Sequence, residues 1–156
     1  MIDLEESIKL LRLRLEIERT IKLLRKNRDL GTAKILVQIG KPAVKPLIKA
    51  LRGEYKFEDI QEKLLFEVAE KECKSLGWAL IEKREIEFRG YVAWALGEIR
   101  GVEAVEVLIE AFTDKYGEVQ TKAVKALVKI GKASVEPLID ALSDESGEGL
   151  QMHSEH

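Results

Sequence analysis

Few residues in this chain could carry catalysis or bind a metal. Its two histidines, His153 and His156, are spaced so that they would share one face of a helix. The stretch before them, residues 143–149, is polar and contains glycine, so we expect a solvated tail there instead of a metal site. No other histidine could serve as base for a serine or cysteine nucleophile, and no Gly-rich phosphate loop precedes a helix. The sequence therefore predicts no enzyme, no metal and no cofactor.

The single cysteine, Cys73, cannot form a disulfide within the chain, and one thiol is not a metal site. We expect it to be a small buried side chain instead of a reactive thiol, in a cytoplasmic protein. No stretch approaches the roughly eighteen apolar residues of a membrane span, and the first residues are acidic where a secretory signal is basic. Charged residues make up 35% of the chain and Asn27 is its only asparagine, a composition typical of heat-adapted proteins.

The charges are distributed unevenly along the chain, although the net charge is only −2. Residues 1–52 hold 13 basic and 6 acidic side chains, residues 53–90 hold 7 and 10, and residues 91–156 hold 6 and 12. The chain is therefore basic at its start and acidic at its end, and this asymmetry bears on the partners it could bind.

One sequence pattern recurs three times. Residues 39–51 align without a gap with residues 130–142, and residues 99–112 fit the same pattern when one loop residue is allowed. In each copy, apolar residues spaced for one helix face lead to a glycine, at 40, 101 and 131, where a helix end tolerates a left-handed residue. A second helix follows, with Pro46 or Pro137 in its opening turn in two of the copies. Its apolar stripe occupies positions 44, 47, 48 and 51, then 105, 108, 109 and 112, then 135, 138, 139 and 142. Such helix–turn–helix units bury their stripes only when they stack on one another.

The string Arg-Gly-Tyr-Val-Ala-Trp-Ala-Leu-Gly-Glu-Ile at 89–99 resembles the first helix of short HEAT repeats, as found in phycobilisome lyases and in many small archaeal and bacterial proteins. The Pro-Leu-Ile-x-Ala-Leu strings resemble the second helix, and the resemblance covers residues 31–52 and 90–142. It implies an all-α fold, an α-solenoid (α-α superhelix) of stacked helix–turn–helix repeats. Such repeats serve scaffolds, adaptors and a few enzymes, so the resemblance specifies the fold and not the function. Some relatives are di-iron hydroxylases with His-Glu pairs on their helices, and this chain has no such pair.

We expect a single HEAT-like repeat domain over residues 1–142. Its parts would be an N-terminal capping helix or helices at 1–30, repeats at 31–52, 90–112 and 118–142, a degenerate repeat or insertion at 53–89, and a flexible tail at 143–156. In the capping segment, Ile17, Ile21 and Leu24 mimic the stripe of a second helix. Residues 53–89 could instead form a helical pair of another shape, and the alternation at 81–88 permits a short strand. We expect Trp78 and Trp94 to be packing or interface residues.

Charged positions of the second helices form two rows down the predicted stack. Lys45, Glu106 and Glu136 are equivalent in one row, and Lys49, Glu110 and Asp140 in the next. The resemblance implies that second helices line the concave surface, so we expect a groove that is basic at its N-terminal end and acidic further on. Additional basic residues at that end are Arg52 and, upstream, Lys22, Arg25, Lys26 and Arg28. Any one of these charges could serve solubility alone, but the ordered change of sign across both rows indicates a binding surface.

Two classes of function fit this surface. The first is a non-catalytic scaffold or adaptor that docks a protein or peptide partner in the groove by complementary charge and a few apolar contacts, with head-to-tail self-association as a variant. The alternative is nucleic-acid binding through the basic N-terminal third, as in alkylpurine DNA glycosylases built from HEAT-like repeats, which the acidic groove residues oppose. A lyase-like auxiliary role, by analogy with bilin lyases, ranks third. We expect no membrane partner.

Overall fold

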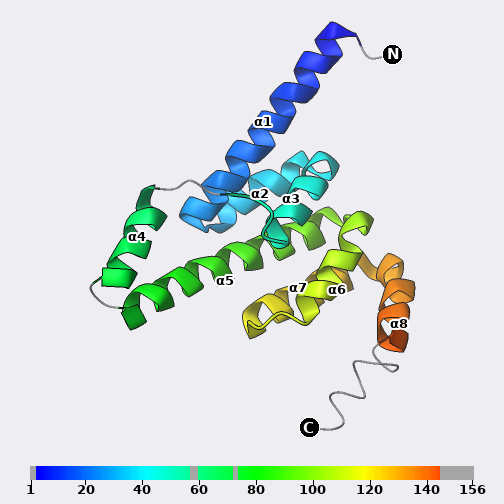
Figure 1. The fold of residues 1–156 in the computed structure, drawn as a ribbon. Coiled ribbons are helices and arrows are strands. Elements are labelled where there is room, and N and C mark those ends of the chain that lie inside the picture. The colour runs from blue at the N-terminus through cyan, green and yellow to red at the C-terminus, as the bar shows by residue number, and fades with distance from the viewer. Residues whose placement is uncertain (1–2, 57–59, 72–73, 145–156) are drawn as a thin grey trace.

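The computed structural model describes residues 3–56, 60–71 and 74–144, and all regular structure within these ranges is helical. The helices in chain order are α1 (Leu4–Asn27), α2 (Leu30–Ile39), α3 (Val44–Leu51), α4 (Ile60–Lys71), α5 (Lys74–Ile99), α6 (Val105–Phe112), α7 (Gly117–Ile130) and α8 (Val135–Asp144), as Figure 1 shows. The all-α prediction is confirmed. No helix in the described ranges is both long enough and apolar enough to cross a membrane.

Apart from α4, the helices after α1 form two layers. In the first layer α5 packs against α2 and α7, and in the second layer α6 packs against α3 and α8. Each first-layer helix is joined directly to its partner in the second layer, as α2 to α3, α5 to α6 and α7 to α8. Successive hairpins therefore add in line, which confirms the predicted α-solenoid (Figure 1).

A short 3-10 helix joins the two helices of each hairpin, at Lys41–Ala43, Val102–Ala104 and Gly131–Ser134. Gly40 and Gly131 have φ angles of 79° and 76°, a region that favours glycine. In the middle hairpin the extra loop residue Arg100 takes the positive φ, 58°, and Gly101 has φ −73°. The expectation of a left-handed glycine at 101 is therefore wrong. Gly101 serves close packing instead, because a Cβ at this position would lie 2.9 Å from Val44 Cγ2.

The second-helix stripes are buried in the middle of the stack and exposed at its C-terminal end. In α3 the buried stripe residues are Val44, Leu47 and Leu51, and α6 buries Val105 and Leu108 of its stripe. In α8, Val135 and Ile139 are exposed, because α8 is the last helix that the structure describes and packs mainly on α6 and on the 3-10 helix Gly131–Ser134. Burial of the stripe therefore depends on having a neighbour, as expected for a stacked repeat.

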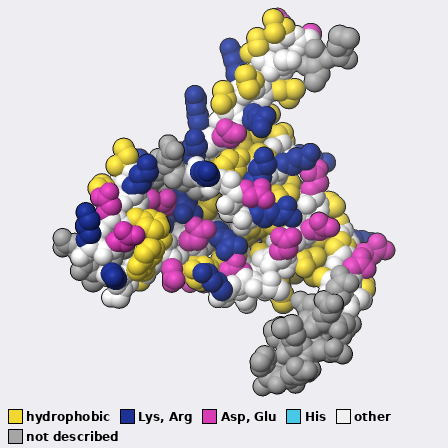
Figure 2. Space-filling view, in the orientation of Figure 1, with side chains coloured by type: hydrophobic (Ala, Val, Ile, Leu, Met, Phe, Trp, Pro, Cys, Tyr) yellow, Lys and Arg dark blue, Asp and Glu magenta, His cyan; other side chains and the backbone are white. Residues whose placement is uncertain are grey.

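Helix α1 is packed along only part of its length. The side chain of Asp3 accepts a hydrogen bond from the backbone N–H of Glu6 at 2.8 Å and caps the helix start. Ile17, Ile21 and Leu24 are buried where α1 packs on α2 and α3. The turns before them are exposed, and this part of α1 projects from the stack with hydrophobic side chains on its surface (Figures 1 and 2).

Residues 74–99 form one continuous helix, α5, which runs through the segment where the sequence left the structure open. The strand permitted by the alternation at 81–88 does not form, and these residues are helical within α5. Helix α4 packs along the first half of α5, where Phe66 and Trp78 meet edge to face with ring centroids 5.0 Å apart. Several apolar side chains of this pair of helices are exposed, including Leu64 and Val68.

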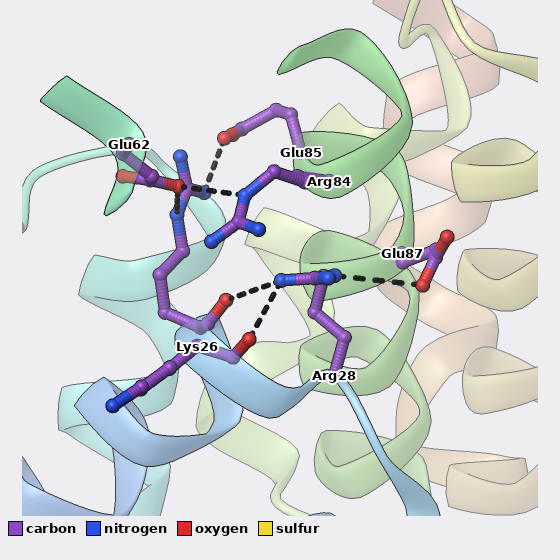
Figure 3. Close-up of polar contacts among 7 residues, drawn as sticks. Lys26, Arg28, Glu62, Arg84, Glu85 and Glu87 are labelled. Atoms are coloured by element: carbon purple, nitrogen blue, oxygen red, sulfur yellow. Dashed lines mark hydrogen bonds and ion pairs between the residues drawn. The ribbon is translucent and has the colours of Figure 1, made fainter. Parts of the chain in front are cut away.

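The α4–α5 pair is attached to the end of α1 by ion pairs (Figure 3). Arg25 donates from Nε to Glu62 Oε1 at 2.9 Å and also pairs with Glu85, while its guanidinium lies over the Phe88 ring at 5.0 Å. Arg28 pairs with Glu87 at 3.5 Å. The side chain of Arg25 is only 14% exposed. Charge at the α1 terminus therefore positions a segment that has little apolar burial of its own.

Candidate functional site

The six charged residues of the two predicted rows and the nearby Arg52 are all exposed, and three neighbouring helices carry them. They are Lys45, Lys49 and Arg52 at α3, Glu106 and Glu110 on α6, and Glu136 and Asp140 on α8. Because α6 lies between α3 and α8, basic residues come first along the second-helix layer and acidic residues follow. This layer is called the charged face below.

A groove of about 400 Å³ lies between α1 and α3, at the basic end of the charged face. Its lining residues are Leu10, Leu13, Arg14, Ile17 and Glu18 from α1, and Pro42, Lys45, Pro46, Lys49 and Tyr55 from α3 and the segments beside it. Leu10, Leu13 and Ile17 follow at i, i+3 and i+7, so one face of α1 supplies an apolar wall. This α1–α3 groove brings two of the predicted site residues, Lys45 and Lys49, together with an apolar surface.

The rim of the α1–α3 groove is predominantly basic. Arg14, Lys45 and Lys49 supply three cations among the lining residues, against one carboxylate at Glu18. Lys45 and Lys49 are four residues apart on α3, so their ammonium groups stand one turn apart on the same face. Such an arrangement attracts a carboxylate-bearing ligand and leaves the apolar wall for its nonpolar side chains.

Tyr55 supplies the groove with a phenol that stays protonated at neutral pH. Its pKa is raised above the ordinary value of 10.0, chiefly because burial penalises the phenolate. The nearby Glu18 carboxylate raises this pKa further, while Arg14 lowers it.

Arg52 belongs to the charged face but is paired within it. Its guanidinium lies 3.4 Å from the Glu110 carboxylate, so this pair joins α3 to α6. Both side chains remain substantially exposed, at 39% and 61%. Arg52 therefore contributes less positive charge to the basic end than the sequence suggested.

Two of the four upstream cations do not extend the basic end. Arg25 and Arg28 point into the ion-pair cluster with α4 and α5, and both are largely shielded from solvent. Arg28 Nη1 also donates to the backbone carbonyl of Lys26 at 2.8 Å, which satisfies the end of α1. The expectation that Arg25 and Arg28 belong to an open basic surface is therefore wrong. Lys22 and Lys26 are exposed as expected.

Sequence reasoning missed the apolar part of the site. It considered only charges on the second helices, whereas the groove wall comes from Leu10 and Leu13 of α1 and from Pro42 and Pro46 beside α3. A signal was present, because α1 carries more apolar residues than the stripe of Ile17, Ile21 and Leu24 requires. That excess indicates a second use for the helix surface.

The remaining candidates for chemistry are metal ligands and the single thiol. Residues 3–56, 60–71 and 74–144 contain no group of three or more His, Cys, Asp or Glu side chains that could hold a metal ion. Cys73, His153 and His156, for which the sequence made specific predictions, lie outside the described residues.

The two helical layers of stacked hairpins define an α-solenoid. Residues 74–156 match the family model for HEAT repeats, which is more than half of the chain. The chain therefore belongs to the HEAT-repeat family. Searches of curated proteins and of solved structures returned no match.

Proposed function

We propose that the protein is a non-catalytic, cytoplasmic scaffold that binds an amphipathic segment of a protein partner in the α1–α3 groove. The observation that carries this proposal is the coincidence of an apolar groove of about 400 Å³ with two exposed lysines, Lys45 and Lys49, on its rim. HEAT repeats are generally protein-interaction scaffolds, which supports the same class of function. The string at 89–99 supports repeats of the short type found in phycobilisome lyases and small archaeal and bacterial proteins.

The groove and the charged face together define the ligand. Apolar side chains of the segment would enter between α1 and α3, where burial of about 25 cal/mol for each Å² of apolar surface supplies affinity. An acidic residue would approach Lys45 and Lys49, and basic residues would follow along Glu106, Glu136 and Asp140. Charge of this kind mainly sets orientation and association rate. The expected ligand is therefore apolar in its centre, acidic at one end and basic at the other.

Nucleic acid fits this surface less well. Arg25, Arg28 and Arg52 are engaged with carboxylates, so much of the basic N-terminal third is neutralised locally. Acidic side chains on α6 and α8 would repel phosphates along the rest of the charged face. Head-to-tail association would place Lys45 and Lys49 against the acidic end of another copy, and the experiment below separates that outcome.

The test is selection of peptides from a random library on the full chain, followed by titration of the selected peptides. We expect enriched peptides to combine leucine-like and acidic residues, and Lys45→Glu plus Lys49→Glu to weaken them by about tenfold to a hundredfold. The matched control is Lys125→Glu plus Lys132→Glu, two exposed lysines away from the groove, for which affinity should change by less than about twofold.

A second variant tests the apolar wall. Leu10 is 55% exposed and lines the groove, so Leu10→Asp should weaken peptide binding with little effect on folding. Equal affinity of both groove variants and wild type would contradict the proposal. If the chain binds labelled DNA with an affinity that falls steeply between about 50 and 200 mM salt, the result would support nucleic-acid binding instead. Head-to-tail association would appear in sedimentation of the peptide-free chain as self-association that weakens at high salt and is lost in Lys45→Glu plus Lys49→Glu.

A further inference from the structure

The projecting half of α1 carries an apolar stripe that covers nothing in this chain. Leu4, Ile8, Leu11 and Leu15 are 77%, 42%, 58% and 44% exposed. Figure 2 shows hydrophobic side chains along this arm. Single exposed leucines are ordinary, but an aligned series on a soluble helix indicates an interaction site.

The stripe has the spacing of a helix–helix seam. Its residues follow one another by 4, 3 and 4 positions, the a and d pattern of a coiled coil. At about 100° per residue they lie within roughly 60° of one another around the helix axis, on the side opposite the buried Ile17 and Leu24. Helix α1 therefore has two apolar faces, one packed on α2 and α3 and one open.

The marginal stability of unpacked helical turns in water is a second reason to expect a partner on the open face of α1. Residues 3–12 are all exposed, so the first turns of α1 have no tertiary support within the described chain. Short helices without packing are only partly formed. A helix laid along Leu4, Ile8, Leu11 and Leu15 would supply that packing.

We propose that the occupant of this seam is a second copy of α1, running antiparallel. In this arrangement Leu4 lies opposite the second copy's Leu15, and Ile8 lies opposite the second copy's Leu11. The seam is self-complementary, so a twofold axis between Ile8 and Leu11 relates the two chains. It extends over about 16 Å of helix.

The flanking charges select the antiparallel direction. Glu5 and Arg12 lie seven residues apart and so border the same side of the seam. In the antiparallel pair Glu5 faces the second copy's Arg12, and the reverse contact forms by symmetry. A parallel pair would bring the two acidic helix starts together and place Arg12 beside the second copy's Ser7 instead of a carboxylate. The helix dipoles also oppose each other favourably when the helices run antiparallel.

The pairing leaves the α1–α3 groove open. Leu13 and Ile17 line that groove from the packed side of α1, whereas the seam lies on the other side. The two solenoids would project from opposite ends of the helix pair, each with its own groove. The seam contains only four apolar residues from each chain, so it should bury less surface than the roughly 1,200 Å² of a stable interface. The dimer should therefore form at micromolar or higher concentration.

Sedimentation equilibrium of the full chain up to about 500 µM tests this pairing. We expect a monomer–dimer equilibrium that Leu11→Glu weakens by at least about a hundredfold, because it places two carboxylates in the seam. The matched control is Leu23→Glu on the same helix, which is 44% exposed but lies beyond the seam and should leave dimerisation unchanged. Far-UV circular dichroism confirms that both variants stay folded.

A charge exchange tests the direction of the helices. Glu5→Arg or Arg12→Glu alone should weaken the dimer by about tenfold, since each change makes two facing pairs repulsive. The double variant should regain the wild-type association constant, because the facing charges are opposite again. Failure of the double variant to regain it overturns the antiparallel pairing. A chain that is monomeric at every concentration, a dimer insensitive to Leu11→Glu, or a monomer that binds anionic vesicles through these leucines overturns the proposal as well.

Discussion

Arg52 of α3 and Glu110 of α6 form an ion pair 3.4 Å long across two successive hairpins of the solenoid. The change of sign along the second helices therefore places opposite charges beside each other at the boundary between repeats. This contact concentrates the open positive charge of the face on Lys45 and Lys49, next to the α1–α3 groove. The charge pattern thus contributes both to the stack and to the surface proposed for a ligand.

Loss of the Arg52–Glu110 pair should change the free energy of unfolding little. Both side chains are well exposed, at 39% and 61%, and exposed pairs contribute at most about 0.5–1 kcal/mol. Arg89 offers the comparison, because it pairs with Asp114 at 2.5 Å with side-chain exposures of only 18% and 9%. We expect Arg52→Ala to cost less than about 0.5 kcal/mol and Arg89→Ala about 2–3 kcal/mol in urea unfolding. A larger cost for Arg52→Ala would mean that the repeat boundary depends on this charge pair.

Close packing of α5 on α7 makes Gly97 intolerant of a side chain. A Cβ at Gly97 would lie 2.6 Å from Ala126 Cα and 2.7 Å from its Cβ, so Gly97→Ala must push the helices apart at a cost of about 2–3 kcal/mol. Gly90 on the same helix is the control, because a Cβ there meets only Lys122 Cγ at an ordinary 3.6 Å. Gly90→Ala should stabilise the protein by about 0.5–1 kcal/mol through helix propensity. The midpoint temperature of thermal unfolding should fall in Gly97→Ala and rise in Gly90→Ala. Equal shifts in the two variants would contradict the prediction.

The solenoid could be predicted from sequence because its signals are local and repeated. The i, i+3, i+4, i+7 stripe recurs in three copies, and each copy needs a neighbour to bury it. The continuity of α5 could not be read in the same way. The repeat resemblance begins at Arg89, whereas the helix begins at Lys74, because a repeat boundary in sequence need not be a helix end. The alternation at 81–88 suggested a strand that does not form, because such a short alternation of apolar and polar residues also occurs in helices.

The candidate site was predictable only in part. The repeat register places Lys45 and Lys49 on the outside of α3 whatever the rest of the chain does. The apolar wall depends on how α1 crosses α3, a packing angle that no local pattern specifies. The fate of Arg25 was equally beyond sequence reasoning, because its partner Glu62 lies 37 residues away on a separate helix.

Arg25 should be required for attachment of α4 to the solenoid. It binds Glu62 and Glu85 and lies over Phe88, so Arg25→Met leaves largely shielded carboxylates without this cation. We expect a loss of about 2–4 kcal/mol, together with faster amide hydrogen exchange in residues 60–71. The neighbouring Lys26 is exposed, and Lys26→Met should change stability by less than about 0.5 kcal/mol. Unchanged exchange in α4 of the Arg25 variant would mean that apolar contacts with α5 hold it alone.

Tyr55 should make the folded state sensitive to alkaline pH. Burial raises the pKa of its phenol above 10.0, Glu18 raises it further, and Arg14 opposes both. The unfolded chain therefore releases this proton at lower pH than the folded chain does. The stabilisation from the neutral phenol is complete below about pH 10 and is lost as the pH rises through the folded pKa. Urea unfolding from about pH 8 to 11 should show wild type losing stability relative to Tyr55→Phe. The difference between the two free energies of unfolding isolates Tyr55, because the lysines and the other tyrosines titrate alike in both proteins.

Glu18→Gln separates the two causes that raise the pKa of Tyr55. Removal of the carboxylate should reduce the alkaline loss of stability without abolishing it, because burial is the larger cause. Absorbance near 295 nm, which follows phenolate formation, should show Tyr55 ionising at lower pH in this variant than in wild type. A peptide carboxylate bound between Lys45 and Tyr55 would act in the opposite sense and raise the phenol pKa again. A selected peptide that leaves this titration unchanged while binding with full affinity would therefore bind away from Tyr55.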